Sequence, residues 1–561
     1  MKNYIIENIS FKKDSINKSL TNYKYGQNWP VIYLLSNNKE IYIGETLNLF
    51  SRLQQHLKNE SKLSLKQVYY VTDDTFNKSV TLDFENRLIS YLSALGKFGI
   101  KLINNNAGQS HEHDYFDRAR YDKLFPEIWN KLMDVGLVNK TLKEIDNYNE
   151  FKYSPFKSLK NEQYTILNEI ISTINSLKKD EKFTFFIEGG AGTGKSLIAI
   201  KLAKIFSQYQ RLSGIDNDYD GSDNDELINE IKILSSYPIN FGLVIPLQSF
   251  RKTIKKVFNN LKNGLSEKQV ISPYSDLFKN DYEIIIVDEA HRLKSGKYLS
   301  QEQGQFKKLN KKYYDGSKKN QLDWIIDRSR IQIIFYDQSQ SVRSSDLSES
   351  EFTKLKRDKN VRVFELKTQF RVKAGNDFIN YIDKVFSSEP PKNKLDFSGY
   401  DLRIFDDIKM FKEEIIKKNN EFGLSRIIAG YSWKWTTKKE KNSSFDFEID
   451  GLPFTWNRKW HDWINYEGSI NEVGCIHTTQ GYDLNYAGVI VGKDLTLTND
   501  VLDINLNNFY DNGSIKGLKS DVISKKNFVL NAYKTMFKRG INGLYLYIVD
   551  ERVKEYFKKY F

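Results

Sequence analysis

Short runs of apolar residues alternate with helical patterns along most of the chain. From residue 156 to residue 561, these runs read FTFFIEG, FGLVIP, YEIIIVDE, IQIIFYD, RIIAGY, AGVIVG and LYLYIVD. Strands with nearly continuous apolar character are buried on both faces, and strands separated by helices form parallel sheets. We therefore predict an α/β fold for this part of the chain, with parallel sheets covered by helices.

The same patterns divide the chain into consecutive segments. We predict an N-terminal extension, a small mixed α/β domain, a polar helical connector and two larger lobes, at residues 1–28, 29–110, 111–155, 156–350 and 351–561. Two insertions interrupt the lobes. One is acidic and lies at about 205–238, and the other is rich in tryptophan and lies at about 431–470.

Composition narrows the class of protein. The 561 residues carry 85 Lys and Arg against 72 Asp and Glu, a net charge of +13, which favours a polyanionic partner. The single cysteine, Cys475, excludes an internal disulfide and a cysteine-based zinc site. No apolar stretch approaches the roughly 18 residues of a membrane-spanning helix. We expect a cytoplasmic protein that does not associate with membranes.

One stretch, GGAGTGKS, fits the phosphate-binding pattern G-x-x-x-x-G-K-[ST] and lies between an expected strand and an expected helix. Glycines let successive backbone N–H groups curl around phosphate oxygens, and the helix N-terminus adds positive potential. Gly189, Gly192 and Gly194 are the candidate cradle. We expect Lys195 to reach the β- and γ-phosphates of ATP and Ser196 to hold Mg²⁺.

About a hundred residues further on, the apolar run EIIIV ends in carboxylates. Carboxylates at the C-terminal end of a central strand face the phosphates of a bound nucleotide. We expect Asp288 to bind Mg²⁺ through water and Glu289 to activate the water that attacks the γ-phosphate. His291 then couples the state of the nucleotide to a second site.

The order of these motifs resembles that of superfamily-one helicases, in which ATP lies between two RecA-like lobes. The resemblance assigns Gln163, ahead of the phosphate loop, to the adenine base, and VIPLQS at 244–249 to the nucleic-acid backbone. Asp337 and Gln340, in IIFYDQSQ, resemble the motif that senses the γ-phosphate.

Motifs of the second lobe follow in the expected order. Arg371, in LKTQFRV, resembles the arginine that reaches phosphate across the cleft. CIHTTQGYD resembles the motif in which Gln480 and Gly481 link ATP to the bound strand. Arg539, in YKTMFKRG, resembles the arginine finger, although the residues before it depart from the commonest form of that motif.

Residues 156–561 resemble more closely a helicase-like family related to the Schlafen-type helicase region. The strings VDEAHRLK, AGYSWKW, GCIHTTQGYDLNYAGVIVG and RGINGLYLYIVD carry this resemblance. It implies a P-loop NTPase with two RecA-like lobes that moves on nucleic acid. Members of that family often carry a GIY-YIG nuclease domain at the N-terminus.

The string VIYLLSNNKEIYIGETLNLFSRLQQH resembles the GIY-YIG signature, with VIY in place of the first triplet. Tyr33 and Tyr42 are the tyrosines of the two triplets, and Arg52 and His56 project from one helix face at i, i+4. Phosphodiester cleavage needs a base, a positive charge at the transition state and a metal near the leaving oxygen. A tyrosine whose pKa is lowered by metal-bound water and Arg52 would orient or deprotonate the nucleophile, and His56 would assist proton transfer.

The metal ligand of this nuclease should be a carboxylate. Glu85 falls on the apolar helix face of TLDFENRLISYLSAL, where an unpaired carboxylate is expensive to bury, so a functional Glu85 that binds Mg²⁺ or Mn²⁺ explains it better. Asn104 or Asn105 matches the late asparagine of the family. His111 and His113 read as a polar loop rather than a metal site.

The tyrosines, the nuclease-like domain and the tryptophans also have structural interpretations. Two tyrosines on a hairpin are commonly packing residues, and a degenerate domain would bind DNA without cutting it. Five of the eight tryptophans lie between Trp433 and Trp463 among lysines and arginines. They either stack bases of a single strand or form a small core that holds the insertion together.

We predict an ATP-dependent DNA translocase or helicase coupled to a metal-dependent GIY-YIG endonuclease, with a role in bacterial defence against phage DNA. One alternative is a repair helicase-nuclease, and another is an ATP-switched DNA-binding protein with an inactive nuclease. RNA stays open as the nucleic acid. A second copy of the chain or partner proteins of a defence system are expected partners, because nucleases of this kind that cut both strands can need two copies.

Overall fold

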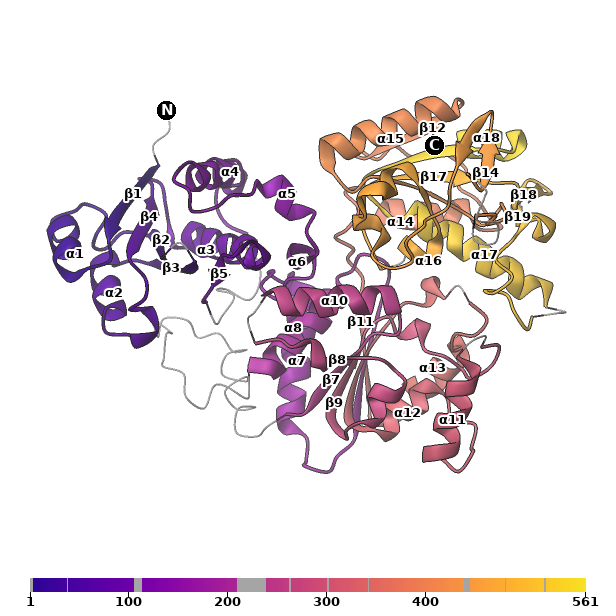
Figure 1. Ribbon diagram of the computed structural model, residues 1–561, viewed down its shortest axis with the longest axis horizontal. Helices are drawn as coiled ribbons and strands as arrows, with labels where there is room; N and C mark the ends of the chain where they lie inside the picture. The colour runs from indigo at the N-terminus through magenta and orange to yellow at the C-terminus, as the bar shows by residue number, and fades with distance from the viewer. Residues whose placement is uncertain are drawn as a thin grey trace. The chain divides into compact units, whose positions relative to one another are not determined.

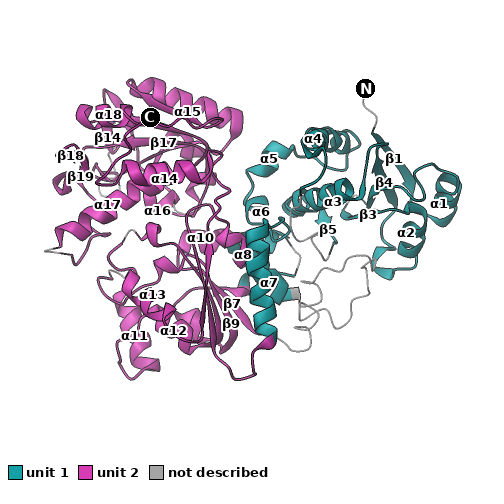
Figure 2. Ribbon diagram, turned by 180° about the vertical axis from the view of Figure 1, so that it is seen from behind, with its two compact units in different colours: residues 1–175, 200–238, 254–267 teal, residues 176–199, 239–253, 268–561 magenta. Residues whose placement is uncertain are grey.

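The computed structural model describes the chain in ten stretches, 4–37, 39–104, 114–208, 239–261, 264–299, 302–341, 343–437, 444–479, 481–518 and 521–561. Two compact units are distinguished in Figure 2. The first comprises residues 1–175, 200–238 and 254–267, and the second comprises residues 176–199, 239–253 and 268–561. Within the described residues, no helix has both the length and the apolar character needed to cross a bilayer.

A five-stranded sheet forms the centre of the first unit, with the strand order β1-β4-β2-β3-β5. All neighbouring pairs are antiparallel except β3 and β5. The strands are β1 (Ile5–Ser10), β2 (Val31–Ser36), β3 (Glu40–Thr46), β4 (Gln67–Thr72) and β5 (Lys101–Leu102).

Side chains of β2 alternate between the two faces of this sheet, as the period of a strand requires. Ile32 and Leu34 join one core with α3 (Lys78–Ser93) and α4 (Arg118–Asp134). Val31, Tyr33 and Leu35 join the other core, with α1 (Lys13–Leu20) and α2 (Leu49–His56). Figure 1 shows these helices around the indigo sheet. Tyr33 therefore faces the helix that carries Arg52 and His56.

The structure differs from the predicted boundaries at both ends of this small domain. β1, inside the expected extension, pairs with β4 along its whole length, from Ile5 with Thr72 to Ser10 with Gln67. The expected connector contributes α4, whose Phe125 and Trp129 share one core with Phe84 of α3. These segments complete the domain because long-range pairing and packing, which no local pattern encodes, recruit them. The helices α5 (Leu142–Asp146), α6 (Asn149–Lys152) and α7 (Asn161–Ser176) follow.

The second unit begins with a six-stranded parallel sheet of order β11-β6-β10-β9-β7-β8. Its strands are β6 (Phe183–Gly189), β7 (Phe241–Val244), β8 (Val270–Ile271), β9 (Tyr282–Val287), β10 (Ser329–Tyr336) and β11 (Val361–Leu366). The helices α11 (Gln303–Tyr313), α12 (Gln321–Asp327) and α13 (Glu349–Lys356) belong wholly to this unit, and α8 (Lys195–Gln208) and α10 (Gln248–Leu261) begin in it. β11 pairs with β6, so the first lobe extends beyond the predicted boundary at residue 350.

A second parallel sheet follows, with the order β12-β20-β17-β13-β16. Its strands are β12 (Asp401–Phe405), β13 (Arg426–Ala429), β16 (Val473–Gly474), β17 (Leu484–Val491) and β20 (Gly540–Ile548). The helices are α14 (Gly375–Val385), α15 (Ile408–Phe422), α16 (Ile476–Thr479), α17 (Val522–Phe537) and α18 (Glu551–Lys558). The prediction of two lobes with parallel sheets is confirmed.

Two hairpins extend this second lobe. One is built from β14 (Phe447–Ile449) and β15 (Leu452–Phe454) and lies in the tryptophan-rich insertion, between β13 and β16. The other is built from β18 (Leu495–Thr498) and β19 (Val501–Ile504). Most of the acidic insertion expected at about 205–238 lies outside the described residues, as do Asn105, His111 and His113.

Candidate functional site

The glycine-rich loop joins β6, which ends at Gly189, to α8, which begins at Lys195. Gly192 and Gly194 have φ of 83° and 85°, a left-handed conformation that side chains rarely adopt. A Cβ atom on Gly192 would lie only 2.6 Å from Cβ of Arg371. Only glycine fits here, so the loop keeps an open backbone of the kind that binds phosphate.

Lys195 lies buried inside this loop. Its ammonium donates to the carbonyl oxygens of Gly189 at 2.6 Å and Gly190 at 2.7 Å. It also lies 3.4 Å from Oδ2 of Asp337, at the end of β10. The positive charge is thus fixed beside the loop by neighbours that belong to adjacent strands.

Asp288 and Glu289 follow β9, which pairs with β10 in the same sheet. Ser196 lies close enough to Asp288 to lower the pKa of its carboxyl, as expected of two residues that share a metal ion. Burial and the neighbouring charge of Glu289 raise the pKa of Asp288. A divalent cation would relieve this repulsion, since it would restore the charge balance of the pair.

Glu289 adopts a left-handed backbone, with φ of 56°. Its Oε2 lies 2.8 Å from Nε2 of His291, an ion-pair distance whose alignment is not that of a hydrogen bond. Burial alone would raise the pKa of Glu289, but His291, Lys195 and Arg539 lower it. Glu289 is therefore ionised near neutral pH, which is the state that a general base requires.

Arg539 connects the second lobe to this site. Its Nη2 donates to Oε1 of Gln340 at 3.2 Å, and Nε2 of Gln340 donates to Oδ2 of Asp337 at 2.6 Å. Asp337 in turn lies beside Lys195. Burial would raise the pKa of Asp337, but Lys195 and His291 lower it to about 2. A continuous polar chain thus runs from the phosphate loop to the arginine of the other lobe.

Arg371 lies on the other side of the loop. The N–H of the preceding Phe370 donates to the carbonyl of Gly192 at 2.8 Å. Nε of Arg371 lies 2.5 Å from Oδ1 of Asp483, which follows Gly481 and Tyr482 in the second lobe. Within the described residues, the buried Nη1 of Arg371 has no hydrogen-bond partner. An anionic ligand would satisfy that donor.

Three other expected residues are placed less fully. Gly481 has φ of 89° and lies against Phe250 of α10. Gln163 is buried in α7, where its Oε1 accepts from the N–H of Lys160 at 3.0 Å, and its contact with adenine stays a prediction. Gln480 lies outside the described residues.

The residues around the loop fit ATP and Mg²⁺. The glycine cradle, the orphan donor of Arg371 and the crowded carboxylates Asp288 and Glu289 all lack what a triphosphate and a divalent cation would supply. No cluster of three His, Cys, Asp or Glu side chains suited to a metal occurs among the described residues. Mg²⁺ needs no such cluster, because it commonly binds one or two side chains together with phosphate oxygens and water.

A second polar cluster lies in the first unit, on the face of the small sheet covered by α2. The phenol oxygen of Tyr33 lies 2.7 Å from Nε2 of His56, and Nε of Arg52 donates to the same oxygen at 3.3 Å. The rings of Tyr42 and His56 have centroids 5.2 Å apart. A Cβ atom on Gly44 would lie 2.3 Å from the Tyr33 oxygen, so the glycine of the second triplet makes room for the tyrosine of the first.

Lys62 belongs to this cluster although no sequence pattern singled it out. It lies on a 3₁₀ turn at Glu60–Lys62 and is almost completely buried. Its Nζ is 3.0 Å from Nδ1 of His56 and 3.7 Å from the centre of the Tyr42 ring. The string ESKLS gives no sign of this, because a lysine between polar residues usually faces solvent.

Asn104 holds the strand that carries Tyr42. Its side-chain oxygen accepts from the N–H of Ile43 at 2.9 Å, and its side-chain nitrogen donates to the carbonyl of Ile43 at 2.7 Å. This is a positioning role rather than contact with a reacting atom. The counterpart Asn105 lies outside the described residues.

The pKa of Tyr33 differs from the expectation that metal-bound water and Arg52 lower it. Burial, Tyr42 and the carboxylate of Glu85 raise the pKa of Tyr33 well above its usual value, and Arg52 opposes them only in part. The protein itself therefore does not lower the pKa of this phenol, because burial outweighs the guanidinium. Burial, Lys62 and Arg52 lower the pKa of His56 to about 2, so its ring is neutral. Glu85 is half-buried on α3, and its charge contributes to the raised pKa of Tyr33.

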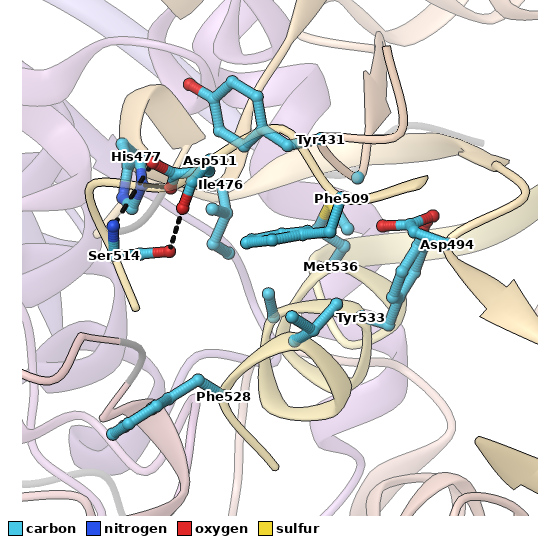
Figure 3. Close-up of a pocket in the computed structure, with 13 residues that line it drawn as sticks. Tyr431, Ile476, His477, Asp494, Phe509, Asp511, Ser514, Phe528, Tyr533 and Met536 are labelled. Atoms are coloured by element: carbon cyan, nitrogen blue, oxygen red, sulfur yellow. Dashed lines mark hydrogen bonds and ion pairs between the residues drawn. The ribbon is translucent and has the colours of Figure 1, made fainter. Parts of the chain in front are cut away.

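A small cavity in the second lobe lies beside the motif that contains Gly481. Figure 3 shows its lining, with His477 and Asp511 on one side and Phe528 and Tyr533 on the other. Nε2 of His477 lies 2.7 Å from Oδ2 of Asp511. The space of about 20 Å³ has room for a single water and is too small for a nucleotide or a base.

Comparison with known proteins supports the assignment of the two lobes. Residues 182–550 match the model of a family described as Schlafen group 3, DNA/RNA helicase domain. The uncharacterized Saccharomyces cerevisiae protein YPL245W is 25% identical over 430 residues, which cover 70% of this chain and 87% of that protein. The family match runs from the first strand of the first lobe to the last strand of the second.

Two solved structures of helicases were also found. A structure described as two coordinating Pif1 helicases unwinding forked double-stranded DNA is 12% identical, covers 72% of this chain and 97% of its own, and has a TM-score of 0.25. The Bacteroides Pif1 helicase in complex with ADP-AlF3 and single-stranded DNA is 10% identical, covers 70% and 96%, and has a TM-score of 0.23.

Proposed function

This chain belongs to the Schlafen group 3 DNA/RNA helicase family, and on that premise we propose that its two lobes form an ATP-hydrolysing motor that moves on nucleic acid. The observation that carries the proposal is the polar chain from Lys195 through Asp337 and Gln340 to Arg539. It joins the phosphate loop of one lobe to an arginine of the other. Hydrolysis that breaks or remakes this chain would move the lobes relative to one another.

Each step of ATP binding and hydrolysis is assigned to particular residues of the site. The backbone of the glycine loop and Lys195 would bind the phosphates, while Ser196 and Asp288 would hold Mg²⁺. When bound, Mg²⁺ neutralises developing charge on the phosphate oxygens. Glu289 would accept a proton from the attacking water, and Arg371 and Arg539 would stabilise charge in the transition state.

ATP hydrolysis by the purified protein, with and without single-stranded DNA or RNA, tests the motor. Lys195→Ala should abolish turnover, because it removes the charge beside the phosphates. Glu289→Gln should abolish turnover but retain ATP binding, because the amide cannot take a proton and the loop is unchanged. Full activity of both variants would contradict the proposal.

We further propose that the small domain is a nuclease of the GIY-YIG type that cleaves DNA with Mg²⁺ or Mn²⁺. The cluster of Tyr33, His56 and Arg52 supports this proposal. An ammonium only donates hydrogen bonds, so Lys62 makes Nδ1 of His56 an acceptor and leaves the ring proton on Nε2. His56 and Arg52 then both donate to the Tyr33 oxygen, which offsets part of the burial that raises the pKa of this phenol.

Cleavage of long linear and supercoiled DNA tests the nuclease. Glu85→Ala should abolish cutting with either metal, because Glu85 is the candidate metal ligand. Lys195→Ala, assayed beside it, asks whether hydrolysis drives the cut. ATP hydrolysis stimulated by DNA without cutting under any metal would leave the motor and remove the nuclease.

The pairing of a motor with a nuclease supports a role in restricting foreign DNA such as phage. Loss of Glu85 or Lys195 would then raise phage plating. A repair role would instead make cells that lack either residue sensitive to DNA damage.

A further inference from the structure

We propose that Trp435 and Trp460 form a stacking site for the unpaired bases of a single nucleic-acid strand. The site lies in the tryptophan-rich insertion of the second lobe, beside His477. The inference rests on the proposed motor function and specifies its substrate as a strand whose bases are exposed.

Three of the five tryptophans in this insertion are structural. Trp456 and Trp463 are fully buried, and Nε1 of Trp463 donates to Oε2 of Glu472 at 2.8 Å. Trp433 stacks on Phe447 of the hairpin, with ring centroids 4.5 Å apart and planes at 14°. These three rings belong to the core that holds the insertion together, and the half-buried Trp435 packs against the same core.

The other two tryptophans are placed differently. Trp435 is half-buried, and Trp460 keeps 42% of its surface exposed. Their ring centroids are 6.0 Å apart, with planes at 33°. The ring centroids of Trp435 and the buried Trp456 are 6.1 Å apart, so the core supports Trp435 and, through it, the exposed Trp460.

The rings of Trp460 and Tyr431 both lie beside His477, which belongs to the motif CIHTTQGYD. Trp460 lies 6.4 Å from the ring of His477, with the planes at 40°, and Tyr431 lies 5.9 Å from it at 37°. Figure 3 shows Tyr431 on the side of the small cavity where His477 and Asp511 lie. The Asp511 carboxylate holds His477 in place at 2.7 Å. The aromatic rings therefore form a continuous series that ends at His477, in the motif that resembles the one linking ATP to the bound strand.

Cationic residues flank Trp435 and Trp460 along the chain. Lys434, Arg458 and Lys459 are exposed on the insertion itself. Burial and the charges of Lys252 and Arg251, on α10 of the first lobe, lower the pKa of His461, which is next to Trp460. Rings interleaved with cations from both lobes match the requirements of a single strand, which offers base faces for stacking and phosphates for charge. In a duplex the bases stack on one another and cannot reach such rings.

Fluorescence anisotropy with two labelled oligonucleotides of about 20 nucleotides tests the site on the full-length protein. One is oligo-dT, and the other has the same backbone with abasic positions throughout. Trp460→Ala should weaken binding of oligo-dT by about 5- to 150-fold, the usual loss for one stacked base. Binding of the abasic strand should not change, because it has no base to stack.

Two further variants sharpen the comparison. Trp460→Phe retains an aromatic face and should bind oligo-dT nearly as well as the wild type. Tyr313→Ala is the matched control, because Tyr313 is a 38% exposed aromatic residue that stacks on Phe278 in the first lobe. It should leave binding of both strands unchanged.

The results of these binding assays distinguish a failure of the stacking site from a failure of the proposed motor function. Unchanged binding of oligo-dT by Trp460→Ala, in a protein that binds the strand and hydrolyses ATP, would overturn the stacking site alone. An equal loss on both strands would also overturn it, since the ring would then act through folding or charge. Failure of the wild type to bind either strand would remove the motor function and the stacking site together.

Discussion

Lys62→Met probes the buried ammonium that no sequence pattern singled out. Methionine keeps an unbranched apolar stem of similar length, so it fills the same space and removes only the charge and its donors. Lys62 lies 3.0 Å from Nδ1 of His56, and its charge is second only to burial in lowering the pKa of that ring. The pKa of His56 should therefore rise from about 2 and stay below 6.5, since the burial remains.

The contribution of His56 to the pH dependence of stability follows from its pKa values in the folded and unfolded states. In the folded protein its pKa is about 2, whereas an unfolded chain has a value near 6.5. The neutral ring is favoured by folding, so the stability is fully present above pH 6.5 and is lost as the pH falls below it. Each pH unit below 6.5 lowers the free energy of unfolding by about 1.4 kcal/mol, which gives a loss of ~2 kcal/mol at pH 5. His56→Gln should remove this part of the pH dependence.

The assay is a ¹⁵N-histidine NMR titration between pH 3 and pH 8. The chain has only six histidines, and the spectrum of His56→Gln assigns the resonance. Wild-type His56 should stay neutral across most of this range and carry its proton on Nε2. Lys62→Met should move its titration upward and release the tautomer, because the donor to Nδ1 is gone.

Lys58→Met is the control, because Lys58 is exposed just beyond the helix that carries His56. It removes the same charge from the same part of the domain and should leave the His56 titration unchanged. An unaltered His56 resonance in Lys62→Met would refute the hydrogen bond and with it the argument for two donors on Tyr33. So would an equal shift in both variants.

Two further predictions concern the phosphate loop and the hydrogen bonds of Asn104. Gly192→Ala should lower ATP turnover at least about tenfold, because the left-handed backbone disfavours a side chain by roughly 1–2 kcal/mol and the new Cβ would lie 2.6 Å from Arg371. Gly190→Ala, whose Cβ would meet nothing within 4 Å, should keep most of its activity, and equal rates for both variants would contradict this account. Asn104→Ala loses both hydrogen bonds to Ile43 and should destabilise the small domain by about 1–3 kcal/mol, measured by chemical unfolding. A variant as stable as the wild type would show that Asn104 does not position the strand.

Local patterns in the sequence determined much of the first lobe. The glycine loop lies between β6 and α8, and the carboxylates follow β9, as the apolar runs beside them predict. Each of these features is encoded within about ten consecutive residues. Apolar periodicity decides which segment is a buried strand, and the loop chemistry sits at its end.

Contacts between distant segments were decided only by the tertiary structure. β1 and β11 each pair with a strand that lies far away along the chain, and Arg539 donates to Gln340 across the two lobes. Lys62 is buried because α2 and β3 close around a turn whose own sequence is polar. The tryptophans of the insertion differ in burial, from the fully buried Trp456 and Trp463 to the exposed Trp460. Burial and pairing depend on which surfaces meet in three dimensions, and a one-dimensional pattern does not contain that information.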